Sequence, residues 1–492
     1  MNKKFKQKNR FTRRGFGHSL FAFSAYPLIS KRINASEKAD VIIIGAGLAG
    51  LNAALNLEQE GYKVIVLEGD DYVGGRVKTL ELPTGNINLG GQTIGPYYAR
   101  VRDIANSLEV PLINPSSRIK MGNYVNGELV SDRDWSKSNA NKTVGEEREV
   151  QPVGLEYFYL SKHNPLPDVE SWLSKSMSDF DISIYDHLKN SGASEEALRI
   201  VSITANVHSI QSASALAYLR DLKRLEWGIP KSKDKNTTLY STSSSSGLTF
   251  SEVKGGTQRL TEAMAEALKG EVRLNQLVKQ ISMSKQDCEV TSIDGKKYNS
   301  RYVISAVPLS ALRNIEINPG FKLVQDDIIK YSSHSNTLRV FLEFSSAFWD
   351  DDIGNPSLYT DTSIERVFAR RVGGEDISLL DCWVNGNGAY RLDQLSKEDL
   401  GIFVLRMLEK IRPSTKDKLK VIDMHSWSKS SLSGCCRHVY SAGQINDWAS
   451  QIAKPHERLY LAGEHTRSIE NGMEAAAKSG ERAAFEILER DS

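Results

Sequence analysis

Apolar residues near the start of the chain follow a strand–helix–strand pattern. Residues 40–44 include a run of β-branched side chains, which is typical of a strand buried on both faces of a parallel sheet. Residues 51–60 have helical composition and end at Gly61, and residues 63–67 have the composition of a second buried strand. The pattern therefore predicts a βαβ unit, in which a helix connects two parallel strands.

Further along the chain, helical patterns give way to strand-like ones. Helical composition is found at residues 182–190, 195–205, 213–225 and 260–268. Residues 231–246 are polar and rich in Ser, which predicts a loop. Residues 337–344 have a strand pattern, and residues 397–411 form an amphipathic stretch. These stretches predict a second region of mixed α+β structure.

Length and composition limit the class of protein. A chain of 492 residues is expected to form two domains rather than one core. With 40% hydrophobic and 25% charged residues, it is neither a disordered or collagen-like chain nor a membrane protein with many spans. Four Cys in this length exclude a disulfide scaffold.

The net charge of +2 is unevenly distributed. Residues 1–35 hold nine basic and no acidic side chains, so the rest of the chain carries about −7. The Arg13-Arg14 pair before the weakly apolar residues 17–30 resembles a bacterial twin-arginine signal, which export machinery reads as an address. We therefore expect export to the periplasm and cleavage near Ala35. The alternative is a basic arm that touches anionic lipid or nucleic acid, although the acidic remainder disfavours nucleic acid as a partner.

A glycine-rich turn follows the first predicted strand directly. It has the spacing Gly-x-Gly-x-x-Gly, which allows backbone N–H groups at a helix start to approach a pyrophosphate. Glu68 lies 18 residues after the last glycine, where an acid can accept hydrogen bonds from a ribose. The predicted dinucleotide-binding residues of this unit are Gly45, Gly47, Leu48, Ala49, Gly50 and Glu68.

Two further glycine-rich segments follow this unit. They contain Gly74, Gly75 and Arg76, and then Gly90, Gly91, Gln92 and Thr93. The spacing Leu-Glu-x(5)-Gly-Gly-Arg-x-x-Thr before a Leu-Gly-Gly segment resembles the flavin-dependent amine oxidases, which include monoamine, polyamine and L-amino-acid oxidases. The resemblance implies FAD as cofactor and places these seven residues beside it.

The resemblance extends over nearly the whole mature chain. It implies an α/β fold with a Rossmann-like FAD domain built from separate segments, and an α+β substrate domain. The implied FAD-domain parts are 38–109, 248–312 and 424–490, and the substrate-domain parts are 110–247 and 313–423. Further cofactor contacts are expected from Val278, Gly463, Glu464, Gly472, Met473 and Glu474.

A pair of cysteines lies where monoamine oxidases bond covalently to their flavin. Counting from Trp427 selects Cys436, whereas the flanking Gly434 and Gly443 select Cys435. We prefer Cys435, because two anchors support it. The alternative is FAD held without a covalent bond, as in many members of the family.

Two arginines depart from the family pattern. An aromatic cage around the amine is expected to be absent, since its two positions hold Gly472 and either Cys436 or Arg437. Arg339 stands where the family commonly has a Lys linked to reaction with oxygen, and it cannot exchange protons as Lys does. If Arg339 and Arg437 both face the substrate, they could bind a carboxylate. Against this, the stretch that carries the carboxylate-binding Arg in venom-type L-amino-acid oxidases reads Leu-Gly-Gly-Gln-Thr here.

The function that these features imply is oxidative deamination of an amine or L-amino acid. A hydride would pass to flavin N5, the imine would be hydrolysed, and oxygen or another redox acceptor, such as a quinone or cytochrome, would reoxidise the flavin. No metal site is expected, because the nine histidines lack ligand spacing. Alternatives are a carotenoid or fatty-acid desaturase or isomerase, and a non-enzymatic FAD-binding protein. The oligomeric state stays open, with a homodimer among the alternatives.

Overall fold

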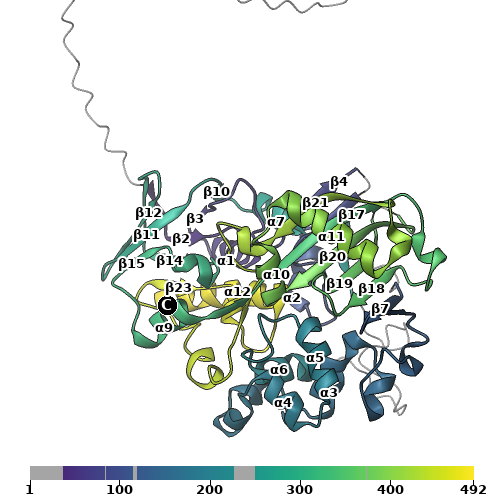
Figure 1. Cartoon of the computed structure of the whole chain (residues 1–492). Helices are drawn as coiled ribbons and strands as arrows, with labels where there is room; N and C mark the ends of the chain where they lie inside the picture. Colours follow the sequence, from purple (N-terminus) through teal and green to yellow (C-terminus); the bar gives the residue numbers. More distant parts are fainter. Residues whose placement is uncertain (1–36, 84, 115–118, 227–249, 373) are drawn as a thin grey trace, which may run out of the picture. The chain divides into compact units, whose positions relative to one another are not determined.

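A computed structural model describes residues 37–83, 85–114, 119–226, 250–372 and 374–492 (Figure 1). The predicted signal at residues 1–35 and the predicted loop at residues 231–246 lie outside these ranges. Within the described ranges, no helix has the length and apolar character needed to cross a membrane.

A five-stranded parallel sheet lies at the centre of the dinucleotide-binding part. Its strand order is β10-β3-β2-β14-β23, and all neighbours are parallel. Its strands are β2 (Val41–Ile44), β3 (Val64–Leu67), β10 (Glu271–Arg273), β14 (Tyr302–Ser305) and β23 (Leu459–Leu461). Four of them are buried along their whole length, which explains why their sequences are continuous apolar runs.

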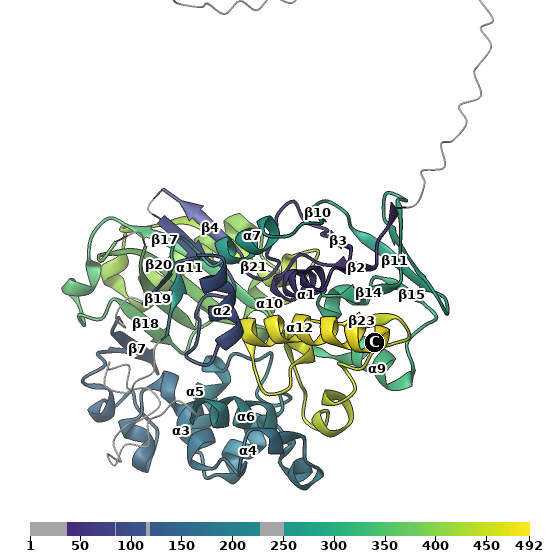
Figure 2. The ribbon, with the colours of Figure 1, turned by 180° about the vertical axis from the view of Figure 1, so that it is seen from behind.

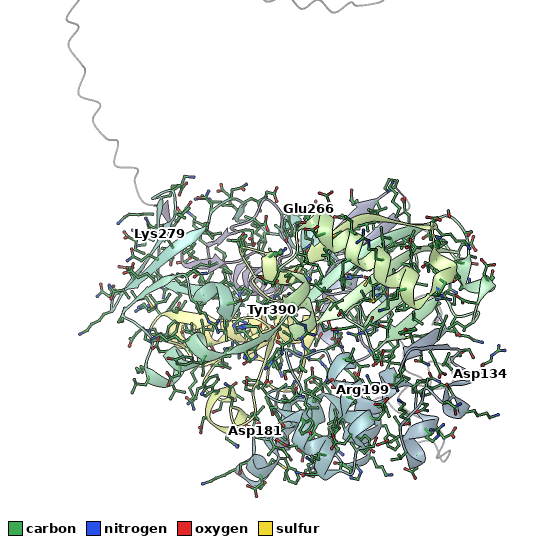
Figure 3. The ribbon with its side chains drawn as sticks, viewed as in Figure 1. Asp134, Asp181, Arg199, Glu266, Lys279 and Tyr390 are labelled. Carbon is green, nitrogen blue, oxygen red and sulfur yellow. The ribbon has the colours of Figure 1, made fainter. Side chains whose placement is uncertain are left out.

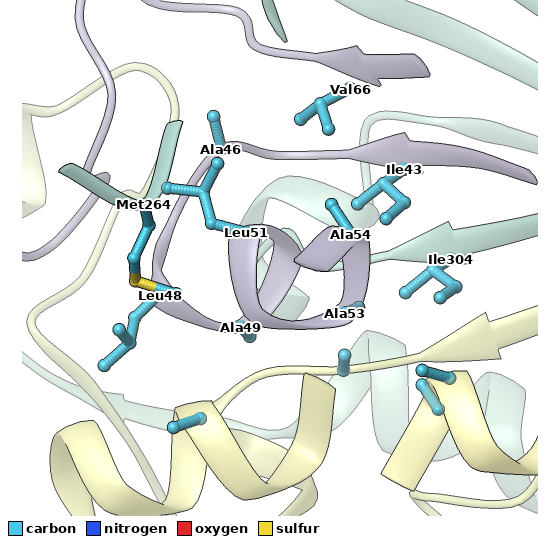
Figure 4. Close-up of a cluster of buried hydrophobic side chains, with 14 of the residues drawn as sticks. Ile43, Ala46, Leu48, Ala49, Leu51, Ala53, Ala54, Val66, Met264 and Ile304 are labelled. Atoms are coloured by element: carbon cyan, nitrogen blue, oxygen red, sulfur yellow. The ribbon is translucent and has the colours of Figure 1, made fainter. Parts of the chain in front are cut away.

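Two long helices cover one face of this sheet. Helix α1 (Leu48–Gln59) connects β2 to β3, and α12 (Gly472–Asp491) packs beside it (Figure 2). Figure 4 shows the apolar cluster between α1 and the sheet, with Ile43, Val66 and Ile304 projecting from the strands. A Cβ on Gly480 would overlap the backbone carbonyl of Ala49, so the two helices touch at a glycine.

A second sheet covers the opposite face. Its order is β1-β13-β12-β11-β15, with strands β1 (Glu37–Lys38), β11 (Val278–Met283), β12 (Cys288–Ser292), β13 (Lys297–Ser300) and β15 (Glu316–Asn318). Alternate residues of β2 face opposite sides of the parallel sheet. Ile42 and Ile44 pack in an apolar cluster with the second sheet, whereas Val41 and Ile43 pack in the cluster on the helix side.

A mixed seven-stranded sheet belongs to the other large part of the fold. Its order is β21-β17-β20-β19-β18-β7-β8. The strands are β7 (Met121–Val125), β8 (Glu128–Val130), β17 (Thr337–Phe344), β18 (Ser357–Thr360), β19 (Arg366–Arg371), β20 (Ile377–Asn385) and β21 (Leu419–Ser426). Helix α11 (Lys397–Ile411) packs its apolar face against this sheet (Figure 1). The strand predicted at 337–344 and the amphipathic helix predicted at 397–411 are both confirmed.

A group of helices surrounds an apolar cluster next to this sheet, in the lower part of Figure 1. They are α3 (Leu155–Lys162), α4 (Ile184–Asn190), α5 (Glu195–Thr204) and α6 (Ala215–Leu225). The remaining α-helices are α2 (Ala99–Ser107), α7 (Gln258–Glu266), α8 (Leu309–Leu312), α9 (Leu323–Tyr331) and α10 (Gly386–Leu392). Three two-stranded ribbons pair β4 (Thr79–Leu82) with β5 (Gly85–Asn88), β6 (Leu112–Ile113) with β9 (Glu252–Val253), and β16 (Ser333–Ser335) with β22 (Arg437–Val439). The boundaries predicted between domain segments stay predictions.

Candidate functional site

A cavity of about 660 Å³ lies at the carboxyl ends of the parallel strands. Its walls include Ile44 at the end of β2, Glu68 after β3, Ala306 after β14 and Gly463 after β23. In open α/β sheets, ligands bind in the crevice at this edge. The cavity continues from there to residues of α6 and β22, so it joins the dinucleotide-binding part to the helical part.

The glycine-rich turn leaves the start of α1 open to a ligand. Gly45 has a φ of +101°, and a Cβ on Gly50 would overlap its carbonyl oxygen. Gly47 provides no side-chain cap for α1, and the first turn has no acidic residue. The first backbone N–H groups of the helix therefore have neither a capping side chain nor a local negative charge, as a pyrophosphate site requires. Gly50 itself lies inside the helix and acts by allowing the tight turn.

Glu68 lies at the end of β3, as the βαβ pattern predicts. Its two carboxylate oxygens accept hydrogen bonds from the backbone N–H groups of Ala46 at 2.7 Å and Asp70 at 2.9 Å. Burial raises the pKa of this carboxyl, while these backbone donors oppose the rise. Val278 and Lys279 of β11 line the same end of the cavity. Figure 3 labels Lys279.

Arg76 and Glu464 form an ion pair farther along the cavity. Arg76 Nη1 donates to Glu464 Oε1 at 2.9 Å and to the carbonyl of Cys436 at 3.1 Å. Glu464 also accepts from the backbone N–H of His438 at 2.9 Å and from Arg467 at 3.2 Å. Burial alone would raise the pKa of Glu464, but Arg76 and Arg467 hold it well below its usual value. This carboxylate therefore stays ionised and ties three separate segments of the chain together.

The glycine pairs let backbone and ligand come close in this region. Gly74 donates its N–H to the carbonyl of Ala46 at 2.9 Å, which packs the second glycine segment against the first turn. A Cβ on Gly90 would overlap the carbonyl oxygen of Arg76, and one on Gly91 would lie 2.9 Å from the sulfur of Met473. The predicted cofactor residues that line the cavity are Gly45, Gly47, Leu48, Ala49, Glu68, Gly74, Gly75, Arg76, Gly90, Gly91, Val278, Cys436, Gly463, Glu464, Gly472 and Met473.

A second helix also begins at this cavity. Helix α12 has Asn471 before its first residue with no side-chain cap, and Gly472 and Met473 line the cavity. Two uncapped helix starts along one cavity suit a ligand with a pyrophosphate at one point and an electron-rich ring at another, as in FAD. The residues present therefore fit this cofactor.

Five predicted cofactor residues do not line the cavity: Gly50 and Cys435, and also Glu474, Gln92 and Thr93. Glu474 is buried and accepts the backbone N–H groups of Arg100 and Val101, so it caps α2 instead. Gln92 donates to Glu252 at 2.9 Å, and Thr93 is exposed. The expectation of direct cofactor contact is corrected for Glu474, Gln92 and Thr93, because none of them lines the cavity and two of them are engaged with other segments.

The two cysteines differ in placement. Cys436 lines the cavity, whereas Cys435 is fully buried with its sulfur 3.4 Å from the hydroxyl oxygen of Ser310. Burial raises the pKa of the Cys435 thiol to about 11, so little thiolate is present at neutral pH. The preference for Cys435 is therefore corrected: the count from Trp427 gives the cavity-facing cysteine, and the glycine anchors do not.

Arg339 is not in the cavity, which corrects the expectation that it meets the flavin. It is 1% exposed on β17 and forms a two-point ion pair with Asp381 of β20, at 2.6 and 3.1 Å. Its remaining nitrogen donates to the backbone carbonyl of Asn88, just before the Gly90-Gly91 segment. The sequence did not reveal this placement, because Asp381 lies 42 residues away and reaches Arg339 only when β17 and β20 pair. Arg339 thus binds the segment at Asn88, which leads to the cavity-lining Gly90 and Gly91.

Arg437, in contrast, lines the far end of the cavity. It lies on β22, and its guanidinium donates to the hydroxyl of Tyr218 on α6. Asp221 lines the same end and pairs with Arg220 at 2.6 Å. The sequence did not single out the remaining polar residues of this compartment, which are Tyr98, Tyr218, Asp221, Tyr440, Arg467 and Asn471. The charged residues of α6 could have indicated this compartment, since two of them, Arg220 and Arg224, are buried.

Fold and cavity together are typical of a dinucleotide-binding protein whose cavity extends beyond the cofactor end. Comparison with known proteins gives the family: residues 48–488 match the model of flavin containing amine oxidoreductases, so the chain belongs to this family. It is 25% identical over 487 residues to human amine oxidase [flavin-containing] B, covering 92% of this chain and 86% of that protein. It is 23% identical to amine oxidase [flavin-containing] of Oncorhynchus mykiss, covering 93% and 87%.

Solved structures agree on the fold. Wild-type putrescine oxidase bound to putrescine superposes with a TM-score of 0.72 at 20% identity, over 92% of this chain and 99% of that chain. Cyclohexylamine oxidase from Brevibacterium oxydans gives a TM-score of 0.74 at 19% identity, over the same shares. The predicted fold class, the FAD cofactor and the reaction class of amine oxidation are thereby confirmed.

Proposed function

We propose that this chain is an exported FAD-dependent enzyme that deaminates an amine or amino acid oxidatively. The proposal rests on one observation: a single cavity joins the glycine-rich edge of the parallel sheet to a compartment lined by Arg437, Tyr218 and Asp221. When bound, FAD takes a hydride from the carbon that bears the amine, and the imine product is hydrolysed in water.

The chain's own residues bind and orient in this scheme. Backbone N–H groups at the start of α1 would hold the pyrophosphate, Glu68 would hold the ribose, and the start of α12 would favour negative charge on the reduced ring. Arg76 and Glu464 fix the segments around the ring. No side chain has to act as a strong base, because the protein supplies orientation and exclusion of water.

The electron acceptor has two candidates. Oxygen is the first, with hydrogen peroxide as product. The second is an amine dehydrogenase that passes electrons to a quinone or cytochrome. The ion pair of Arg339 with Asp381 favours it, because the family position linked to reaction with oxygen then presents no cation to the cavity. Parallel assays with oxygen and with a soluble quinone, at equal substrate concentration, separate the two.

Any covalent bond to FAD would run through Cys436. The support is that this cysteine lines the cavity beside the Arg76 and Glu464 pair, while Cys435 is turned away. Acid precipitation tests for the bond, since covalent flavin stays in the pellet.

Export is supported by the Arg13-Arg14 pair ahead of a weakly apolar stretch. Cell fractionation of the wild-type precursor and of an Arg13→Lys/Arg14→Lys precursor tests it. Periplasmic recovery of the first and cytoplasmic retention of the second are expected, and equal distribution of both would contradict export by this route.

The enzymatic proposal is tested by anaerobic addition of an amine and amino-acid panel to the purified flavoprotein. Loss of the oxidised flavin spectrum with at least one compound is expected. A desaturase of the same fold would keep its spectrum with every amine, and the charged far end of the cavity already disfavours an apolar polyene or acyl substrate.

A further inference from the structure

The far end of the cavity contains more positive than negative charge. Arg437 and Arg467 line it, and Arg220 and Arg224 lie on α6 directly behind it. The carboxylates at this end are Asp221 and Glu464. How each arginine is paired decides whether a ligand must supply further negative charge.

Two of the four arginines have carboxylate partners. Arg220 binds Asp221 at 2.6 Å, and Arg467 binds Glu464 at 3.2 Å. Both carboxylates are thereby engaged, since Glu464 is shared with Arg76 as well. Asp221 has three arginines around it, and they hold its pKa below the usual value although burial opposes this. A cationic group of a substrate would therefore find little uncompensated negative charge here.

Arg437 has no such partner. Within the described part of the chain, it forms no ion pair, and its hydrogen-bond partner is the hydroxyl of Tyr218. Its Nε is buried without an acceptor. Tyr218 stays neutral, because burial raises its pKa, and its own hydrogen goes to the carbonyl of Asn206 at 3.2 Å. Tyr218 thus orients the guanidinium without neutralising it. Burial would lower the pKa of Arg437, but Tyr218, Asp221 and Glu464 raise it, and both carboxylates are already paired with other arginines.

Arg224 adds to the excess. It is 4% exposed, and it donates to Asn471 Oδ1 at 2.6 Å while Nε and Nη1 lack acceptors. Its guanidinium carbon lies 5.9 Å from the ring centre of Tyr98, and both Tyr98 and Asn471 line the cavity. The other acid near Arg437 is Glu156, a buried carboxyl whose pKa burial raises to about 7, so at neutral pH it is only partly ionised.

Arg437 is half-buried and its Nε lacks an acceptor, so a carboxylate of a ligand can bind it at two points. We propose that the substrate is an amine that also carries a carboxylate, and that Arg437, held by Tyr218, binds this carboxylate. The inference rests on the proposed function, which leaves an amine or an amino acid as the substrate, and selects the amino acid. An α-amino acid and an ω-amino acid share this chemistry, and they differ only in the distance between the two groups.

Binding of carboxylates that carry no amine tests the inference without turnover. The holoenzyme is titrated with acetate, hexanoate, benzoate and 3-phenylpropanoate, and with the matching neutral amides, while the flavin difference spectrum is recorded. We expect at least one carboxylate to bind and its amide not to. Arg437→Gln should raise the Kd about 10- to 100-fold, the usual effect of losing a hydrogen bond to a charged group.

Two variants serve as controls. Arg406→Gln changes an exposed arginine of α11 far from the cavity walls and should leave the Kd unchanged. Arg437→Lys keeps the charge but loses the planar fork, and should lie between wild type and Arg437→Gln. Equal carboxylate affinity in wild type and Arg437→Gln, or no carboxylate binding in wild type, would overturn the inference.

Matched substrates separate this inference from the proposed function. The pairs are phenylalanine with phenethylamine and leucine with isopentylamine, together with 4-aminobutanoate and 6-aminohexanoate for the ω class. Flavin reduction by amino acids, with a KM that rises in Arg437→Gln while kcat changes little, supports the inference. Reduction by the plain amines alone overturns it and leaves the proposed function standing. If no compound in the whole panel reduces the flavin, the proposed function itself fails.

Discussion

The two ends of the cavity are built in different ways. At the cofactor end, backbone forms much of the wall beside a few side chains such as Glu68 and Arg76: glycines at strand ends, two uncapped helix starts and the segment at Gly90 and Gly91. At the far end, the walls are side chains, among them Arg437, Tyr218 and Asp221. Backbone walls bind what all members of a cofactor class share, whereas side-chain walls can change with the substrate.

Two arginines, Arg339 buried and Arg437 half-buried, differ in the same way. Arg339 lies behind the cofactor end and is fully paired, since Asp381 meets it at two points. Arg437 lies at the far end with a neutral phenol as its partner. A paired buried arginine is structural, because removing it leaves an unmatched acid. An arginine without an ion-pair partner can instead bind an anionic group of a ligand.

The cofactor end should be the more sensitive to a single methyl group. Gly50→Ala places a Cβ against the carbonyl of Gly45, so we expect loss of bound FAD and more than about 4 kcal/mol of destabilisation. Flavin content and urea unfolding measure both. Gly374→Ala is the matched control, because no atom lies within 4 Å of its added Cβ. Full flavin content in Gly50→Ala would contradict the tight turn.

Removal of charge should affect the free energy of unfolding differently at the two arginines. Arg339→Met leaves Asp381 with Arg370 alone, and we expect a loss of about 3–5 kcal/mol in the free energy of unfolding. Arg437→Met removes a half-buried charge that forms no ion pair, although Asp221 and Glu464 lie near enough to favour it, and should change the free energy of unfolding of the ligand-free protein by less than about 1 kcal/mol. Urea unfolding of both variants checks this. Equal destabilisation would remove the contrast between the two ends.

Glu156 should make stability depend on pH near the far end. Its pKa is about 7 in the folded chain against 4.5 as its ordinary value, so between these pH values the folded state holds a proton that the unfolded state has lost. Stability therefore falls as pH rises from 4.5 to 7, by up to about 3 kcal/mol from this group. Glu156→Gln should remove that share. The test compares unfolding of wild type and variant at pH 5 and pH 8, and a constant difference would argue against a buried acid there.

The cysteine pair gives the smallest effect on stability. Cys435→Ala should cost about 1 kcal/mol, because a fully buried thiol leaves a small void, and it should leave the flavin unaffected. Cys436→Ala should cost less. If wild-type flavin stays in an acid pellet, Cys436→Ala should release it and Cys435→Ala should not, whereas the reverse result would restore the register set by the glycines.

What the sequence predicted follows the same division. The βαβ unit, β17 and α11 were predictable, because local patterns of apolar residues determine them. The cofactor end was largely predictable too, since its glycines lie in short motifs with fixed spacing. The exceptions there were Gln92, Thr93, Cys435 and Glu474, none of which lines the cavity; the Glu474 side chain, for example, binds the start of α2.

The far end and Arg339 needed the fold. Tyr218 meets Arg437 from 219 positions away in the chain, and Arg339 meets Asp381 only through strand pairing. Neither contact leaves a local pattern. Arg437 could be named as a candidate from the family position, but its lack of a carboxylate partner could be seen only with α6 in place.

The most direct test of the account is anaerobic mixing of the flavoprotein with an amino acid and with the corresponding decarboxylated amine, in wild type and in Arg437→Gln. We predict that both proteins hold the same amount of flavin, that the amino acid reduces the wild-type flavin, and that Arg437→Gln needs about 10- to 100-fold more of it. A wild-type flavin that no amine or amino acid reduces would contradict the account.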